Sequence, residues 1–150
     1  MKGLLRTSAI GLAVAAVGAV TFAVPAAGAD LPTCSRYTLM NRGGHTINVP
    51  TSKGNSSCQM GRDYAVADRK VVLEFQLALK FCYAKLNLAS PYSDEKIANL
   101  DADGFFGSRT EAALKAVQRY AGAGVDGIYG RNTRDHIKFL DSNRRNCYAY

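Results

Sequence analysis

The sequence predicts a mainly α fold of three helices, preceded by a short segment of β-hairpin and loop. Two observations point to it. Apolar residues recur at intervals of three and four over residues 68–88, which is the period of an α-helix. The motif Asp-Gly-x-aromatic-Gly-x-x-Thr occurs twice, at residues 103–110 and 126–133, and a helical pattern follows each copy. The chain has 150 residues, 47% of them hydrophobic, which indicates about one globular domain and excludes a disordered chain.

The first 29 residues are interpreted as a signal peptide. Lys2 and Arg6 precede an uncharged run at residues 9–24, and Ala27-Gly28-Ala29 fits a small-x-small cleavage site. A membrane anchor is the less favoured alternative, because the run is short and rich in Ala and Gly. Cleavage would leave 121 residues with a net charge of +5. We therefore expect a secreted protein, either extracellular or associated with the cell wall.

Residues 30–66 are predicted to be an N-terminal extension that a disulfide closes. Two β-prone runs, at residues 37–40 and 45–49, flank a hairpin turn at residues 41–44. All four cysteines lie after the signal peptide, and an even number in an exported chain indicates disulfides. Spacing alone allows three connectivities. We favour Cys34–Cys58, which closes the extension, and Cys82–Cys147, which ties a helix to the C-terminal tail.

Residues 67–150 are predicted to be the helical domain and its tail. Asp68 is placed to cap the first helix. A connector follows at residues 89–102, and the sequence leaves open whether a short helical turn forms around residues 95–99. The second helix is predicted over residues 109–121, with Tyr120 on its apolar face, and the third over residues 132–141.

Each Asp-Gly motif is predicted to form a turn that leads into a helix. The Asp side chain can accept a hydrogen bond from its own backbone two residues on, and the following Gly can adopt positive φ. Ser108 and Glu111 fit a capping box at the start of the second helix. The predicted structural turn residues are Asp103, Gly104, Phe106, Gly107, Thr110, Asp126, Gly127, Gly130 and Thr133.

These motifs resemble those of peptidoglycan-binding-domain-like modules in secreted bacterial wall hydrolases. The resemblance rests on both Asp-Gly motifs, on the stretch from Thr110 to Gln118, and on Phe75-Gln76 in the first helix. It covers about residues 66–141, and the cysteine-bearing extension resembles small secreted actinobacterial proteins. The resemblance implies a three-helix fold that binds the bacterial wall without catalysis.

The candidate ligand-binding residues lie beside the turns or at a helix end. The two tyrosines carry a polar hydroxyl on an apolar ring, which suits the edge of a binding groove. The structural alternative is that their rings fill the core. The other three begin helices and could donate to a carboxylate or a sugar, or could simply be solvated. These candidates are Tyr83, Arg109, Tyr129, Arg131 and Asn132.

Catalysis is the less favoured interpretation. Asp103 and Asp126 could form a carboxylate pair for sugar hydrolysis, but each stands at the same place in its motif, which favours a turn role. No Cys or His cluster has the spacing of a metal site, so neither a metal nor another cofactor is expected.

The predicted function is that of a secreted, non-catalytic, monomeric protein that binds peptidoglycan or another anionic wall polymer. Attraction to such a polymer would weaken with salt. A separate wall hydrolase is a further expected partner, and export argues against nucleic acid. Two alternatives remain: a secreted inhibitor or toxin-like factor that reuses the scaffold, and a cryptic wall amidase or glycosidase.

Overall fold

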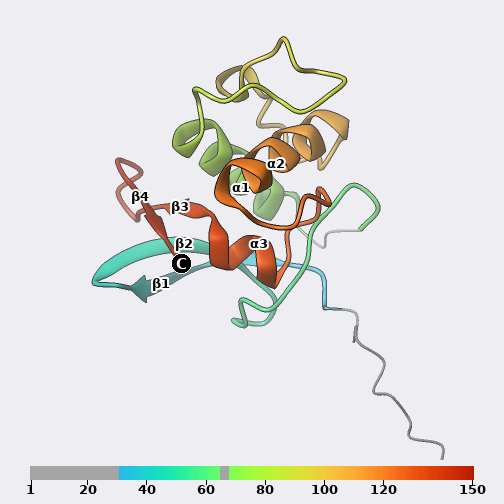
Figure 1. Cartoon of the computed structure of the whole chain (residues 1–150). Coiled ribbons are helices and arrows are strands. Elements are labelled where there is room, and N and C mark those ends of the chain that lie inside the picture. Colours follow the sequence, from blue (N-terminus) through green and yellow to red (C-terminus); the bar gives the residue numbers. More distant parts are fainter. Residues whose placement is uncertain (1–30, 65–67) are drawn as a thin grey trace, which may run out of the picture.

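The computed structural model describes residues 31–64 and 68–150. The predicted signal peptide therefore lies outside the described residues, and the predicted boundary at residues 66 and 67 stays a prediction. The elements follow one another as shown in Figure 1: β1 (Arg36–Arg42), β2 (His45–Thr51), α1 (Arg69–Cys82), the short 3-10 helix η1 (Ile97–Asn99), α2 (Ser108–Ala121), α3 (Arg131–His136), β3 (Lys138–Leu140) and β4 (Cys147–Ala149). Among the described residues, none of the helices combines the length and the apolar character needed to cross a membrane.

The predicted hairpin is confirmed. Strands β1 and β2 pair antiparallel, from Arg36 opposite Thr51 to Arg42 opposite His45. Gly43 and Gly44 form the turn between them, and both have positive φ. Two consecutive residues with positive φ are what a tight two-residue hairpin turn requires, and glycine adopts them at little cost.

Both favoured disulfides are present. Cys34–Cys58 closes the extension, and Cys82–Cys147 joins the end of α1 to β4. The extension does not build a core of its own. Instead, its buried side chains join those of the helices and of β3 in a single cluster, which includes Ile47, Phe75 and Phe139.

Helix α1 begins where the sequence predicts, since the Asp68 side chain accepts a hydrogen bond from the backbone N–H of Lys70 (2.9 Å). It ends at Cys82, six residues earlier than predicted. The following segment pairs with the connector instead: the N–H of Leu88 donates to the carbonyl of Glu95, and the N–H of Ile97 donates to the carbonyl of Leu86. The connector does contain a helical turn, a point that the sequence left open, and it is η1.

Helix α2 ends at Ala121, and its C-cap, Gly122, adopts the left-handed conformation with φ 74°. Its start differs from the prediction, because Gly107 is the N-cap and no side chain caps the helix. The two residues of the expected capping box have other partners. The Ser108 hydroxyl bonds to the Tyr92 hydroxyl (2.8 Å), and the Glu111 carboxylate accepts from Lys115.

The prediction of a mainly α fold is wrong. Helix α3 ends at His136, and the residues expected to continue it form β3, which pairs antiparallel with β4 from Lys138 opposite Ala149 to Leu140 opposite Cys147. Ile137 and Phe139 are buried while Lys138 between them is exposed, which is the two-residue period of a strand. The fold is therefore α+β, with two antiparallel hairpins packed against three α-helices within the described residues.

The hairpins and the connector lie at opposite ends of the helical pair (Figure 1). Strand β2 extends toward β3 through a bridge between Ile47 and Asp141. At the other end, the long connector runs over α1 and α2. The two Asp-Gly turns are held by side chains of α1 and α2.

Candidate functional site

The first Asp-Gly turn (residues 103–107) is held by one buried glutamine of α1. The Gln76 amide nitrogen donates to the Asp103 carboxylate (3.0 Å), to the Phe105 carbonyl (2.9 Å) and to the Thr110 hydroxyl (3.0 Å). Its amide oxygen accepts from the N–H of Gly104 (2.9 Å). The predicted Asx turn is also present, because the Asp103 carboxylate accepts from the N–H of Phe105 (2.9 Å).

The second Asp-Gly turn (residues 126–130) has the same arrangement around a glutamine of α2. The Gln118 amide nitrogen donates to the Asp126 carboxylate (2.7 Å), the Ile128 carbonyl (3.0 Å) and the Thr133 hydroxyl (2.8 Å). Its amide oxygen accepts from the N–H groups of Asp126 and Gly127. Each glutamine thus joins a helix, the turn after it and the helix after that turn.

The two aspartates are occupied as acceptors in these turns. Hydrogen bonds from the Phe105 N–H and from the Gln76 amide lower the pKa of Asp103, and the nearby Arg69 adds to the effect. A general acid for sugar hydrolysis needs a raised pKa. The surroundings of Asp103 act in the opposite direction and fit a turn role.

The two candidate tyrosines are buried. Tyr129 has no exposed surface, and its ring packs edge-on against Phe75 (5.2 Å between centroids), so it is a core residue and not a groove edge. Tyr83 is 6% exposed, and its hydroxyl accepts from the backbone N–H of Lys138 (2.6 Å). This contact fixes the start of β3 against the end of α1.

The three other candidates lie at the surface, at the start of two different helices. Arg109 donates to Glu95 of the connector (2.7 Å), its guanidinium carbon lies 5.2 Å from the Tyr92 ring centroid, and the pKa of Arg109 is raised by Glu95. Arg131 is exposed at the start of α3. The Asn132 side chain is held against the loop that follows α2, since its amide oxygen accepts a hydrogen bond from the N–H of Gly124 (2.8 Å). The structure therefore does not gather the five candidates on one surface.

A different surface runs along the first half of α2, and we call it the α2 groove. It consists of three adjoining hollows of about 220, 320 and 310 Å³. The first lies at the first Asp-Gly turn, the second beside the connector, and the third at the second Asp-Gly turn. The hollows adjoin because neighbours share lining residues. The lining of the groove includes Arg62, Tyr92, Ser108, Arg109, Glu111 and Lys115.

The α2 groove carries accessible charges of both signs. The side chains of Arg62 and Arg109 are 59% and 51% exposed. Between them, Glu111 contacts both Lys115 and Arg62, and the hydrogen bond from Lys115 lowers the pKa of Glu111, which stays a carboxylate. Such a surface can donate to carboxylates and carbonyls, accept from amides, and offer the Tyr92 ring to an apolar face.

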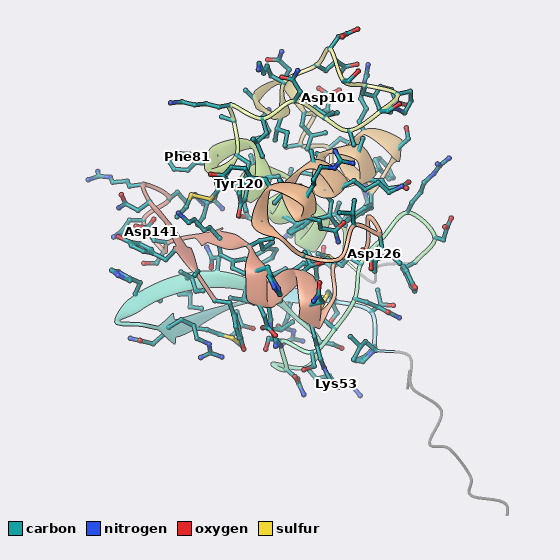
Figure 2. All side chains as sticks on the ribbon, in the orientation of Figure 1. Lys53, Phe81, Asp101, Tyr120, Asp126 and Asp141 are labelled. Carbon is teal, nitrogen blue, oxygen red and sulfur yellow. A yellow bond between two sulfur atoms is a disulfide. The ribbon has the colours of Figure 1, made fainter. Side chains whose placement is uncertain are left out.

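Sequence reasoning missed most of this groove. Arg62 and Tyr92 lie in segments without helical or strand periodicity, and only the fold brings them to α2. Tyr120 was assigned to the apolar face of its helix but is 70% exposed. Together with Phe81, which is 51% exposed, it lines a separate hollow at the end of α1, and Figure 2 shows the two rings at one edge, away from Asp126.

Comparison with known proteins gives a match to a family model. Residues 69–137 match the model of the peptidoglycan binding domain family. The matched segment begins with α1 and ends just after α3, so it holds both Asp-Gly turns and leaves both hairpins outside. The resemblance of the Asp-Gly motifs to this family is thus confirmed. No curated protein and no solved structure matches the chain.

Proposed function

We propose, from the match of residues 69–137 to the peptidoglycan binding domain family, that this chain is a secreted, non-catalytic protein that binds peptidoglycan through the α2 groove. The match is the observation that carries the proposal, and it supports peptidoglycan as the general kind of partner. The two disulfides among the described residues are consistent with an extracellular or wall location.

The placement of the groove supports its role. Most of its lining belongs to the matched segment, and both Asp-Gly turns open onto it. Peptidoglycan offers carboxylates, amides and sugar rings. The exposed guanidinium groups of Arg62 and Arg109 suit the carboxylates, and the carboxylate of Glu111 suits the amides. The geometry thus favours mixed polar recognition over a purely electrostatic attraction.

The absence of catalysis is part of the proposal. It is supported by the turn hydrogen bonds that occupy Asp103 and Asp126. Purified protein incubated with dye-labelled peptidoglycan should release no dye above the buffer blank. Release that rises with protein concentration would contradict this part and would favour a wall amidase or glycosidase.

Secretion is also part of the proposal, and it rests on the pattern of residues 1–29. N-terminal sequencing of protein recovered outside an expressing bacterial cell should begin at Asp30. Recovery only in the cytoplasm, with Met1 retained, would contradict it. A separate wall hydrolase is the proposed protein partner, and the exposed Phe81 and Tyr120 offer aromatic surface for such a contact.

The main experiment is co-sedimentation of the exported protein with purified, teichoic-acid-free peptidoglycan at low and at high salt. Pelleting should persist at high salt. The double variant Arg62→Ala/Arg109→Ala should lower the bound fraction at least fivefold, whereas Arg119→Ala, which removes an exposed cation at the other end of α2, should bind like the wild type.

Three results would contradict the proposal. Pelleting at low salt alone would indicate general charge attraction. Pelleting at neither salt would reject wall binding and would favour a secreted inhibitor or toxin-like factor. Equal losses in the double variant and in Arg119→Ala would reject the groove. The ion pairs of Arg62 and Arg109 are exposed, and exposed ion pairs contribute little to stability, so all variants should melt at the same temperature.

A further inference from the structure

The two disulfides of the described residues differ in exposure. Cys34 and Cys58 have no exposed surface, whereas Cys82 and Cys147 are both partly exposed. Thiol–disulfide exchange begins when a thiolate reaches one sulfur of the bond, so access limits its rate. A thiol in solution can therefore approach Cys82–Cys147 in the folded protein, while Cys34–Cys58 is shielded until the fold opens.

The surroundings of Cys82 favour such an approach. Cys82 lines a surface hollow of about 310 Å³ at the end of α1, together with the exposed residues Phe81, Lys85 and Tyr120. Figure 2 shows the two rings at one edge of the molecule. The hollow has no carboxylate in its lining, and Lys85 makes no ion pair within residues 31–64 and 68–150. The ammonium group of Lys85 thus favours thiolates beside the disulfide.

The C-terminal tail is also held by contacts that do not involve this disulfide. Strand β4 pairs with β3, and the guanidinium carbons of Arg42 and Arg134 each lie 4.3 Å from the centroid of the Tyr150 ring. The Tyr150 hydroxyl bonds to the hydroxyl of the buried Ser56 (2.8 Å). We expect these contacts to keep the tail in place when the disulfide is opened, so that the two thiols stay close enough to pair again.

We propose that Cys82–Cys147 is a thiol-exchange site, which a dithiol reductant opens and a disulfide oxidant closes while Cys34–Cys58 stays intact. The proposal rests on the contrast in exposure between the two bonds and on the hollow beside Cys82. It does not depend on wall binding. Exposed disulfides are the labile and regulatory ones, whereas buried structural disulfides resist reduction. The exchange gives the tail two covalent states on one fold.

The reduction takes place in two steps. A thiolate of the dithiol attacks Sγ of Cys82, the bond to Cys147 breaks, and the Cys147 sulfur leaves with the electron pair and takes up a proton. The second thiol of the reductant, as its thiolate, then attacks the reductant sulfur of the mixed disulfide, and the Cys82 sulfur leaves and is protonated in turn. The two cysteines gain two electrons and two protons, which the dithiol loses as it becomes a disulfide.

The test is timed reduction of the exported protein by dithiothreitol without denaturant. Samples are quenched with N-ethylmaleimide, and peptide mapping by mass spectrometry measures the labelling of each cysteine. Cys82 and Cys147 should be labelled at least tenfold faster than Cys34 and Cys58, at a rate proportional to the dithiothreitol concentration. Equal labelling of the four cysteines, or a rate that does not depend on dithiothreitol, would show that reduction waits for unfolding and would overturn the proposal.

Two further measurements test the reversibility of the site and the sulfur that is attacked. Oxidised glutathione added to the partly reduced protein should restore Cys82–Cys147. Reduced glutathione, a monothiol, should be trapped by acid as a mixed disulfide on Cys82. Failure to restore the bond, or a mixed disulfide on Cys34 or Cys58, would contradict a reversible site at the hollow.

Variants separate the hollow from the stability of the fold. Lys85→Gln should slow the initial labelling of Cys82 and Cys147 at least twofold, whereas Arg131→Gln, which removes an exposed cation at the start of α3, should leave it unchanged. The double variant Cys82→Ser/Cys147→Ser should keep the backbone amide signals of β1 and β2 and should melt at a lower temperature. Equal rates in the two charge variants, or loss of the fold in the double variant, would overturn the proposal.

Discussion

The two Asp-Gly turns share one hydrogen-bond pattern but differ in what surrounds them. Gln76 reaches a turn that lies 27 residues further along the chain, across the whole connector, whereas Gln118 reaches a turn only 8 residues away. The donor and acceptor distances are nevertheless alike. The glutamine therefore defines the turn, and the length of chain between the helix and the turn does not.

The surroundings differ most at the glycine. A methyl group on Gly104 would lie 2.9 Å from the backbone carbonyl of Arg69, while one on Gly127 would meet side-chain carbons of Glu111 and Lys115 at 2.8 Å. The backbone of a helix cannot move away from an added methyl group without distorting the helix, but surface side chains can change rotamer. The first turn is thus packed against a rigid wall and the second against a flexible one.

The largest expected effect comes from removing the glutamines. Gln76→Ala and Gln118→Ala each leave several buried polar groups unpaired, and each such group costs about 1–3 kcal/mol. We expect each variant to lower the free energy of unfolding by about 3 kcal/mol or more. The loss in Gln118→Ala should be at least as large as that in Gln76→Ala, because Gln118 accepts hydrogen bonds from two N–H groups and Gln76 from one. Denaturant unfolding measures this. A loss below about 1 kcal/mol at either position would mean that the turn forms without its glutamine.

The glycines give the sharpest contrast. Gly104 and Gly127 have φ of 78° and 76°, so the strain of placing alanine there, about 1–2 kcal/mol, is common to both. Gly104→Ala adds a clash with backbone, and we expect it to cost at least about 1 kcal/mol more than Gly127→Ala. Thermal and denaturant unfolding of the pair would measure the difference. Equal losses would show that the wall behind Gly104 yields as readily as side chains do.

Acid should weaken the first turn through Asp103. Because its pKa is lowered in the folded state, its carboxylate stabilises the fold at pH above its ordinary value of 3.8, and this contribution is lost as the pH falls through the lowered pKa. The contribution of the Asp103 carboxylate to stability is small, since Asp103 is exposed. The wild type should exceed Asp103→Asn in stability at pH 7, and the gap should narrow at pH 3. A gap that stays constant between these two pH values would assign the loss to altered hydrogen bonding alone.

The smallest expected effect concerns the exposed ring of the first turn. The Arg69 guanidinium carbon lies 3.4 Å from the centroid of Phe105, which is 56% exposed, and exposed contacts of this kind contribute about 0.5–1 kcal/mol. A double-mutant cycle with Arg69→Gln and Phe105→Ala should give a coupling of that size. The corresponding position of the second turn, Ile128, has no such partner cation among the described residues, and Ile128→Ala serves as the comparison. No coupling would mean that Arg69 acts only through its hydrogen bond to the Asp103 carbonyl.

Local signals in the sequence were enough to predict the turns, the hairpin and the start of α1. Asp103 and Asp126 bond within a few residues, and Gly43 and Gly44 specify a turn by themselves. The turns, the hairpin and the start of α1 depend on neighbours in the chain, so a single sequence contains the information. The disulfides join distant residues, and spacing left three connectivities open, of which the favoured one is present.

Features that depend on distant partners were not predictable in this way. The spacing of Ile137 and Leu140 is typical of one face of a helix. The segment instead forms a strand because it pairs with the strand that begins at Cys147, and this pairing is not visible in the spacing. The loop that holds Met60 pairs with the backbone of Tyr129 in both directions and helps to bury it, whereas no element of the described residues covers Tyr120. The α2 groove likewise depends on Arg62 and Tyr92, which only the fold places beside each other.

The disulfide between Cys82 and Cys147 has a consequence for proteolysis. It encloses the connector, both Asp-Gly turns, α2 and α3 in one covalent loop. A protease that cuts the connector therefore produces two fragments that remain a single molecule, with α1 still tied to the tail. Such a nicked chain would migrate intact until a reductant is added, and its turns could keep their glutamine contacts after the cut.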